Sequence, residues 1–221
     1  MQDMYEQIAK EIRARGAHLG LISTLDIVRD PRWGRTEESF SEDPYLASKM
    51  TEAAVYGLQG SSKKDLKRND KIGAVLKHFA AQGSGEGGIN AAPALIGERE
   101  LYDIHLPAMR AGAEAGAVGC MAAYNEIDGI PCHANKELLT DILRDEMNFD
   151  GIVMADGVAI DRLNMLTGSY EKSAAMALSA GVNVSLWDKS FTTLEEAVNQ
   201  GYVSEEAIDQ SVRLVLRLKF S

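Results

Sequence analysis

The chain has 221 residues, of which 45% are hydrophobic and 25% are charged, a composition typical of one globular domain with a sizeable core. Its net charge of -10 argues against nucleic acid and against an anionic membrane surface as partners, because both attract basic proteins. No apolar run approaches the ~20 residues of a membrane span. The two cysteines, Cys120 and Cys132, are too few for a disulfide framework or a zinc site, and they favour a reducing, cytoplasmic location.

Short apolar runs alternate along the chain with segments of helical periodicity. Five runs predict buried strands, at residues 19–27, 74–79, 117–124, 151–156 and 182–187. Helices are expected near residues 5–15, 44–56, 98–115, 135–147, 157–166 and 170–180, and from about 192 and 204 onward. Pro44 suits the first turn of its helix, and Asn135 is a good N-cap. This alternation predicts an α/β fold, with a parallel sheet covered by helices.

Two architectures fit the pattern, a closed (β/α)8 TIM-type barrel and an open doubly wound sheet. Both bind ligands at the carboxyl ends of the strands, which is where the polar residues fall. These residues are Asp26, Arg29, Lys77, His78, Tyr124, Asp156 and Asp188. A closed barrel needs eight strands and five are predicted, so either the sheet is open or the chain lacks the first strands of a barrel.

A glycine-rich segment, Gly83 to Gly88, matches the G-x-G-x-x-G pattern of dinucleotide-binding proteins. That pattern requires a helix to open within the motif, so that the helix N-terminus meets the pyrophosphate. Here the residues INAAPALIG intervene before any helical periodicity. The segment is therefore interpreted as a flexible loop at the mouth of the site, and no cofactor is predicted.

Three short patterns could carry chemistry, and each also has a structural explanation. Lys77 and His78 end a strand and could reach a pocket together, although a lone buried histidine is more often part of the core. The segment RDPRWGR places three arginines and Trp33 within seven residues, which suits either sugar binding or a structural ion-pair loop. Asp156 ends an apolar strand, so it is either catalytic or the N-cap of the next helix.

Four longer segments together resemble one family. They are RDPRWGRTEESFSEDPYLASKM, LKHFAAQGSGEGGINAAPALIGERELYDIHLPAM, CMAAYNEIDGIPCHANKELLTDILRDEMNFDGIVMAD and VSEEAIDQSVRLVLRLKF. In this order they are similar to the N-terminal barrel domain of family 3 glycoside hydrolases, the β-glucosidase and β-xylosidase group. The resemblance spans nearly the whole chain. It implies a single, incomplete barrel domain over residues 1–221, without the family's C-terminal domain.

The resemblance implies a role for each matching residue. Asp156 matches the nucleophile that forms a covalent glycosyl-enzyme intermediate during retaining hydrolysis of a terminal β-linked glucose or related sugar. The positions that match the sugar-binding subsite are Arg35, Lys77, His78, Met121 and Tyr124. The partner would be an oligosaccharide or β-glycoside, and the reaction would use no metal and no cofactor. A retaining enzyme places two carboxyl groups about 5–5.5 Å apart.

The sequence also departs from the family pattern. Gly157 follows the nucleophile where the family usually has an aromatic residue or histidine, so one wall of the sugar site is open or filled from elsewhere. Ile89 stands where many members carry an arginine. The acid/base glutamate is expected from the family's C-terminal domain, since neither Glu86 nor Glu126 has a positional match. Three alternatives stay open, namely a catalytically silent fragment or carbohydrate-binding remnant, a nucleotide-dependent α/β oxidoreductase, and phosphorolysis instead of hydrolysis.

Overall fold

The computed structural model covers residues 1–221 and describes every side chain except those of Ile22, Ser23 and Lys63. Its main sheet has four parallel strands. In sheet order they are β1 (Leu19–Thr24), β2 (Gly73–Phe79), β3 (Gly119–Ala122) and β6 (Ile152–Met154). Each strand neighbours the next one of this set along the chain, as in a sheet that is wound in one direction. The predicted parallel sheet is therefore confirmed.

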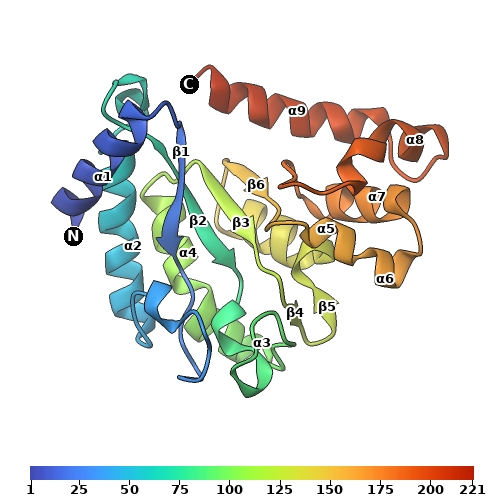
Figure 1. Cartoon of the computed structure of the whole chain (residues 1–221), viewed down its shortest axis with the longest axis horizontal. Coiled ribbons are helices and arrows are strands. Elements are labelled where there is room, and N and C mark those ends of the chain that lie inside the picture. Colours follow the sequence, from blue (N-terminus) through green and yellow to red (C-terminus); the bar gives the residue numbers. More distant parts are fainter.

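Helices separate the strands and close the chain (Figure 1). The α-helices are α1 (Gln2–Ala14), α2 (Pro44–Gln59), α3 (Glu98–Glu100), α4 (Pro107–Glu114), α5 (Ala159–Arg162), α6 (Asn164–Thr167), α7 (Tyr170–Ala180), α8 (Leu194–Asn199) and α9 (Glu205–Lys219). Two π-helices, Leu101–His105 and Glu137–Glu146, and a hairpin of β4 (Glu126–Ile127) with β5 (Ile130–Pro131) complete the elements that frame the site.

The helix starts follow local capping chemistry. Asp43 accepts a hydrogen bond from the Tyr45 amide at 2.9 Å, and Pro44 begins α2. Asn135 Oδ1 accepts from the Leu138 amide at 3.0 Å, as a residue that caps the second π-helix should. Both starts agree with the prediction from the sequence.

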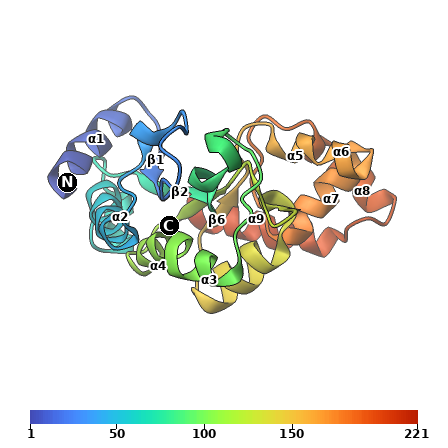
Figure 2. The ribbon, with the colours of Figure 1, turned by 90° about the horizontal axis from the view of Figure 1, so that it is seen from below.

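Helices cover one face of the sheet, and this decides between the two predicted architectures. The main core joins alternate strand residues such as Leu76 and Val153 to α2 and α4. The opposite face carries a separate small cluster of Val75, Met121 and Met154, which contains no helix residue. Figure 2 shows α1, α2 and α4 gathered together beside the sheet. A doubly wound sheet has helices on both faces, so the structure fits a barrel-type fold whose barrel is not closed.

The fifth predicted strand, residues 182–187, is reduced to one parallel bridge, between Met154 and Val184. Two backbone hydrogen bonds accompany this bridge, from the Asn183 amide to the Val153 carbonyl (2.8 Å) and from the Ala155 amide to the Val184 carbonyl (2.7 Å). The side chain of Asn183 accounts for the reduction, because its Oδ1 accepts a hydrogen bond from the Val153 amide at 2.9 Å. The backbone then turns away at Trp187, whose φ is +68°. A polar side chain thus replaces part of the backbone ladder.

The two ends of the sheet have different surroundings. The loops after β1 and β2 meet at the carboxyl ends of the strands, and α9 crosses the opposite end (Figure 1). A cavity of about 750 Å³ lies near the amino ends, lined by apolar residues such as Leu19 and Ile152 and by cations such as Arg13 and Lys219. Among the described residues, no helix combines the length and apolar character needed to cross a membrane.

Candidate active site

Asp156 lies two residues after Met154, the last residue of β6, at the carboxyl end of the sheet. The residue is only 8% exposed, and its side chain is 12% exposed. Oδ1 accepts a hydrogen bond from the Gly157 amide at 2.8 Å. Oδ2 is buried and accepts no hydrogen bond from the residues whose side chains are described, although His78 Nε2 lies 3.6 Å away. Buried polar atoms are normally satisfied, and Asp156 Oδ2 is one of five buried side-chain oxygens without a hydrogen-bond partner among the described residues.

Asp188, and not Asp156, caps the helix that follows β6. Its Oδ1 accepts hydrogen bonds from the amides of Ile160 (2.8 Å) and Asp161 (3.2 Å), at the start of α5. Its Oδ2 accepts from the Leu186 amide at 3.0 Å. Burial raises the pKa of Asp188, while the three amide contacts act in the opposite direction. The interpretation of Asp156 as an N-cap is therefore wrong, because a residue from another loop performs that task.

His133 and Tyr124 hold the backbone around Asp156. His133 Nε2 accepts a hydrogen bond from the Asp156 amide at 3.1 Å. Burial lowers the pKa of His133 to about 3, so the ring is neutral and can act as an acceptor at ordinary pH. Tyr124 donates its hydroxyl to the Gly157 carbonyl at 2.9 Å, and burial together with the Asp156 charge raises the pKa of Tyr124. Two side chains thus fix the residue pair that presents the carboxylate.

His78 connects the end of β2 to the loop after β1. Its Nδ1 lies 2.7 Å from Asp26 Oδ2, and the same oxygen accepts from the His78 amide at 3.2 Å. Its Nε2 lies 3.1 Å from Arg35 Nη2. The peptide bond between Lys77 and His78 is cis, as is that between Phe79 and Ala80. With Nδ1 bonded to a carboxylate and Nε2 to a guanidinium, His78 is held on both sides near Asp156.

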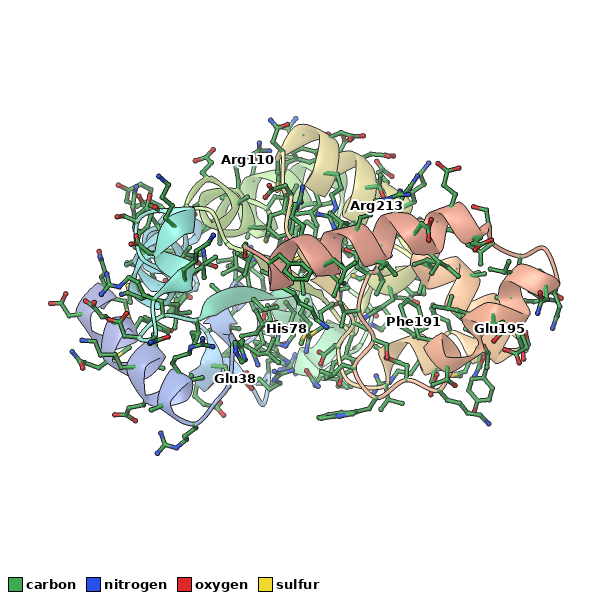
Figure 3. All side chains as sticks on the ribbon, turned by 90° about the horizontal axis from the view of Figure 1, so that it is seen from above. Glu38, His78, Arg110, Phe191, Glu195 and Arg213 are labelled. Atoms are coloured by element: carbon green, nitrogen blue, oxygen red, sulfur yellow. The ribbon has the colours of Figure 1, made fainter. Side chains whose placement is uncertain are left out.

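Glu38 joins the two cations of the site. It accepts from Arg35 Nε at 2.7 Å and Nη2 at 2.9 Å, and from Lys77 Nζ at 3.2 Å. The bidentate contact with Arg35 and the contact with Lys77 lower the pKa of Glu38 to about 2. Figure 3 shows Glu38 and His78 close to one another. Strand β2 and the loop after β1 together build a rigid patch of hydrogen-bond donors beside the carboxylate.

The chemical capacity of this cluster follows from its groups. Arg35 and Lys77 are fixed donors of the kind that binds sugar hydroxyls or an anion. Among the described residues, no three His, Cys, Asp or Glu side chains are arranged to hold a metal ion. The cluster therefore places the Asp156 carboxyl group beside two cations that can donate hydrogen bonds.

Met121 occupies a different layer from the other predicted site residues. It is 3% exposed and packs with Val75 and Met154 on the face that helices do not cover. Val75 and Met154 each lie two positions before a site residue, so by strand alternation they line the same face one layer deeper. Met121 thus belongs to the apolar floor beneath the polar cluster.

The two interpretations of the loop after β1 can now be compared with its contacts. Trp33 is only 2% exposed and donates its indole N–H to Asn90 Oδ1 at 3.0 Å, so it offers no stacking face to a sugar. Of the three arginines in its segment, Arg32 is paired with Asp30 in an exposed bidentate contact, and Arg29 lies 3.7 Å from Glu100. The loop is therefore partly an ion-pair loop, and Arg35 is the arginine that reaches the cluster.

Two glycines of the glycine-rich loop pack against the segment that follows β1. A Cβ at Gly83 would lie 2.6 Å from the Ile27 carbonyl oxygen, and one at Gly88 would lie 2.9 Å from the Arg32 Cβ. Glycine is needed here because the loop lies directly against the segment after β1. The next α-helix begins at Glu98, so the rejection of a dinucleotide fold stands.

Several residues of the site were not predicted as such. Asp26 and Asp188 were noted only as polar residues at strand ends, and Glu38 and His133 were not singled out. Glu38 could have been recognised from its i, i+3 spacing to Arg35 in the segment RTEE, which suits an ion pair. His133 gave no local signal, because its partner is a backbone amide 23 residues away.

Comparison with known proteins places this geometry in a family. Residues 1–218 match the model of the glycosyl hydrolase family 3 N-terminal domain. A candidate β-xylosidase of Formosa agariphila is 41% identical over 98% of this chain and 29% of its own length, and a periplasmic β-glucosidase of Salmonella typhimurium is 35% identical over 96% and 28%. The chain thus spans less than a third of these relatives.

Solved structures agree with the family match. A β-glucosidase from Listeria innocua superposes with a TM-score of 0.95 at 38% identity, covering 99% of this chain and 30% of that enzyme. The same enzyme has been solved with glucose, and a mutant of it with laminaribiose. The chain belongs to glycosyl hydrolase family 3 and matches its N-terminal domain.

Proposed function

We propose that this chain carries the nucleophile half of a retaining β-glycosidase site, with Asp156 as the nucleophile. The observation that supports this most is the state of the carboxylate. It is buried at the carboxyl end of the sheet, one of its oxygens is unpaired among the described residues, and the capping role is taken by Asp188. Parallel α/β folds place catalytic residues at this end of the strands.

The proposed reaction has two displacements. An oxygen of Asp156 attacks the anomeric carbon and forms a glycosyl ester, while the bond to the leaving oxygen breaks and that oxygen takes up a proton. Water then attacks the same carbon, gives up a proton to a base, and releases the carboxylate. Arg35, Lys77 and His78 would bind hydroxyls of the sugar and hold its anomeric carbon within reach of Asp156. Tyr124 would keep the Gly157 backbone in place.

The acid that protonates the leaving oxygen is proposed to come from outside this chain. Glu38 has a pKa of about 2, so it is ionised at neutral pH and cannot donate a proton efficiently. Asp26 already accepts two hydrogen bonds from His78. The relatives are more than three times as long as this chain, which leaves room for a further domain that supplies the acid.

The proposed substrate is a terminal β-linked glucose or a related sugar. The names of the relatives support this class, as do the glucose and laminaribiose complexes of the structural neighbour. A cytoplasmic location is also proposed, on the two free and buried cysteines, and cell fractionation would test it.

A mechanism-based label tests the proposal without the missing acid. The chain is incubated with 2,4-dinitrophenyl 2-deoxy-2-fluoro-β-glucoside, whose leaving group needs little protonation, and its intact mass is followed. The expected result is an increase of one fluoroglucosyl group that peptide mapping assigns to Asp156. Asp156→Asn is the control and should take no label.

The same experiment separates the alternatives. A catalytically silent, carbohydrate-binding chain would bind glucose but take no label. Label on a residue other than Asp156 would overturn the assignment of the nucleophile. Once labelled, the chain can be diluted into buffer with or without inorganic phosphate. Release that accelerates with phosphate and yields fluoroglucosyl phosphate would favour phosphorolysis over hydrolysis.

A further inference from the structure

Trp187 is a large apolar side chain on the surface beside the site. It is 82% exposed, whereas the other tryptophan, Trp33, is 2% exposed. Its φ of +68° is strained for a bulky residue. Exposed aromatic surface and unusual backbone geometry both occur preferentially at functional sites. Neither feature is needed for packing, since the ring contributes almost nothing to the core.

The ring of Trp187 flanks Gly157, the residue after the proposed nucleophile. A Cβ built on Gly157 would lie 3.4 Å from Cε3 and from Cζ3 of Trp187, and 3.2 Å from the Tyr124 hydroxyl. The indole therefore borders the space that a side chain at position 157 would enter. An aromatic wall next to Asp156 is thus supplied from the segment after residue 182.

Hydrogen bonds fix the backbone on both sides of Trp187. Val158 donates its amide to the Leu186 carbonyl at 2.9 Å. Asp188 binds the Leu186 amide and the first amides of α5, and Asp161 in turn accepts from the amides of Lys189 and Ser190. Because the backbone is fixed on both sides of the ring, little backbone entropy is lost when a ligand packs against Trp187.

The position of the ring indicates which part of a substrate it would contact. The hydroxyl-binding cations Arg35 and Lys77 are mostly buried and come from the loop after β1 and from β2. Trp187 comes from the segment after Val184, and Val184 pairs with β6, the edge strand opposite β1. The Trp187 side chain is open to solvent. The attacked sugar fits the buried side, and the group attached to it extends toward solvent.

We propose that Trp187 is the stacking platform for the leaving-group part of the substrate, a second sugar ring or an aryl aglycone. This inference rests on the proposed function, because it needs a sugar bound over Asp156. Sugar rings and aryl groups present flat apolar faces that pack on an indole. Trp187 therefore sets the preference for the leaving group, and it leaves binding of the attacked sugar to the buried cluster.

Two ligands that the site cannot readily cleave provide the test. Glucose occupies only the attacked-sugar position, and phenyl 1-thio-β-glucoside adds an aryl group through sulfur. Calorimetry on the 221-residue chain compares wild type with Trp187→Ala and Trp187→Phe. Trp187→Ala should weaken thioglucoside binding roughly 3- to 10-fold and leave glucose binding unchanged, and Trp187→Phe should restore most of the loss. Phe220→Ala, which removes an equally exposed ring on the C-terminal segment, should change neither affinity.

Fluorescence gives a second measurement on the same samples. Acrylamide should quench the exposed Trp187 in preference to the buried Trp33, and the phenyl thioglucoside should protect Trp187 where glucose does not. Equal thioglucoside affinity in wild type and Trp187→Ala would overturn the platform while fluoroglucosyl labelling of Asp156 still supports the proposed function. A wild-type chain that takes no label and binds no thioglucoside would overturn both.

Discussion

Replacement of Asp188 by alanine should destabilise the protein far more than replacement of Asp156. Asp188 accepts hydrogen bonds from three buried or half-buried amides. Leaving one such amide without a partner lowers the stability of the fold by about 1–3 kcal/mol. Burial of the charge offsets part of this loss. We therefore expect Asp188→Ala to lower the free energy of unfolding by about 2–4 kcal/mol. This corresponds to a fall in Tm of roughly 4–16 °C for a chain of this length.

Asp156→Ala removes one hydrogen bond, to the adjacent Gly157 amide, together with a buried oxygen that has no described partner. Its expected effect is within about 1 kcal/mol of zero, since loss of an unsatisfied buried charge offsets loss of the bond. Urea unfolding of both variants, followed by circular dichroism, measures the difference. If Asp156→Ala is as destabilising as Asp188→Ala, Asp156 has a structural role and the argument from its unpaired oxygen fails.

Three further predictions concern pH, the cation bridge and the aromatic wall. Burial lowers the pKa values of His133 to about 3 and His105 to about 4, below the unfolded value of 6.5. The stability that these two neutral histidines contribute is thus fully present above pH 6.5. It is lost as pH falls, by up to about 1.4 kcal/mol per pH unit for each histidine. His133→Gln should therefore make the unfolding free energy depend less steeply on pH between pH 7 and 5. Glu38→Gln should slow fluoroglucosyl labelling about 10-fold, because the two cations lose their shared anchor, while the pH-7 Tm measured alongside changes by only a few degrees. Gly157→Phe should cost about 1–3 kcal/mol by crowding the Tyr124 hydroxyl, 3.2 Å from the added Cβ, and the Trp187 ring, 3.4 Å from it, and adding Trp187→Ala in the same chain should recover part of this cost; equal costs in both backgrounds would refute the contact with Trp187.

The parallel sheet and the grouping of its carboxyl-end residues could be predicted from the sequence. The apolar runs of β2, β3 and β6 are uninterrupted, and their ends carry Lys77, His78 and Asp156. Parallel strands bring such ends to one edge, so the meeting of His78 and Asp156 follows from topology. The segment at 182–187 has the same apolar pattern, but no local signal shows that the Asn183 side chain replaces part of the ladder.

The two tryptophans show what a single sequence leaves undetermined. Trp33 lies in the arginine-rich segment that suits sugar binding, yet its indole N–H bonds to Asn90, which in turn accepts from Gln82. Asn90 lies 57 residues after Trp33 and 8 residues after Gln82, so the burial of Trp33 depends on long-range packing. Trp187 lies at the end of an apolar run that resembles a core strand, and it is exposed because the backbone turns outward there.

The reciprocal contacts of Asp161 and Asp188 have a consequence for motion. Asp188 binds amides at the start of α5, and Asp161, on α5, binds amides of the segment that follows Asp188. Neither loop can open without breaking hydrogen bonds on both, so their amides should exchange with solvent deuterium as one cooperative unit. Asp156 and Trp187 each adjoin one of these two mutually bonded segments. We therefore expect the distance between Asp156 and Trp187 to persist through local fluctuations that displace the other loops of the site.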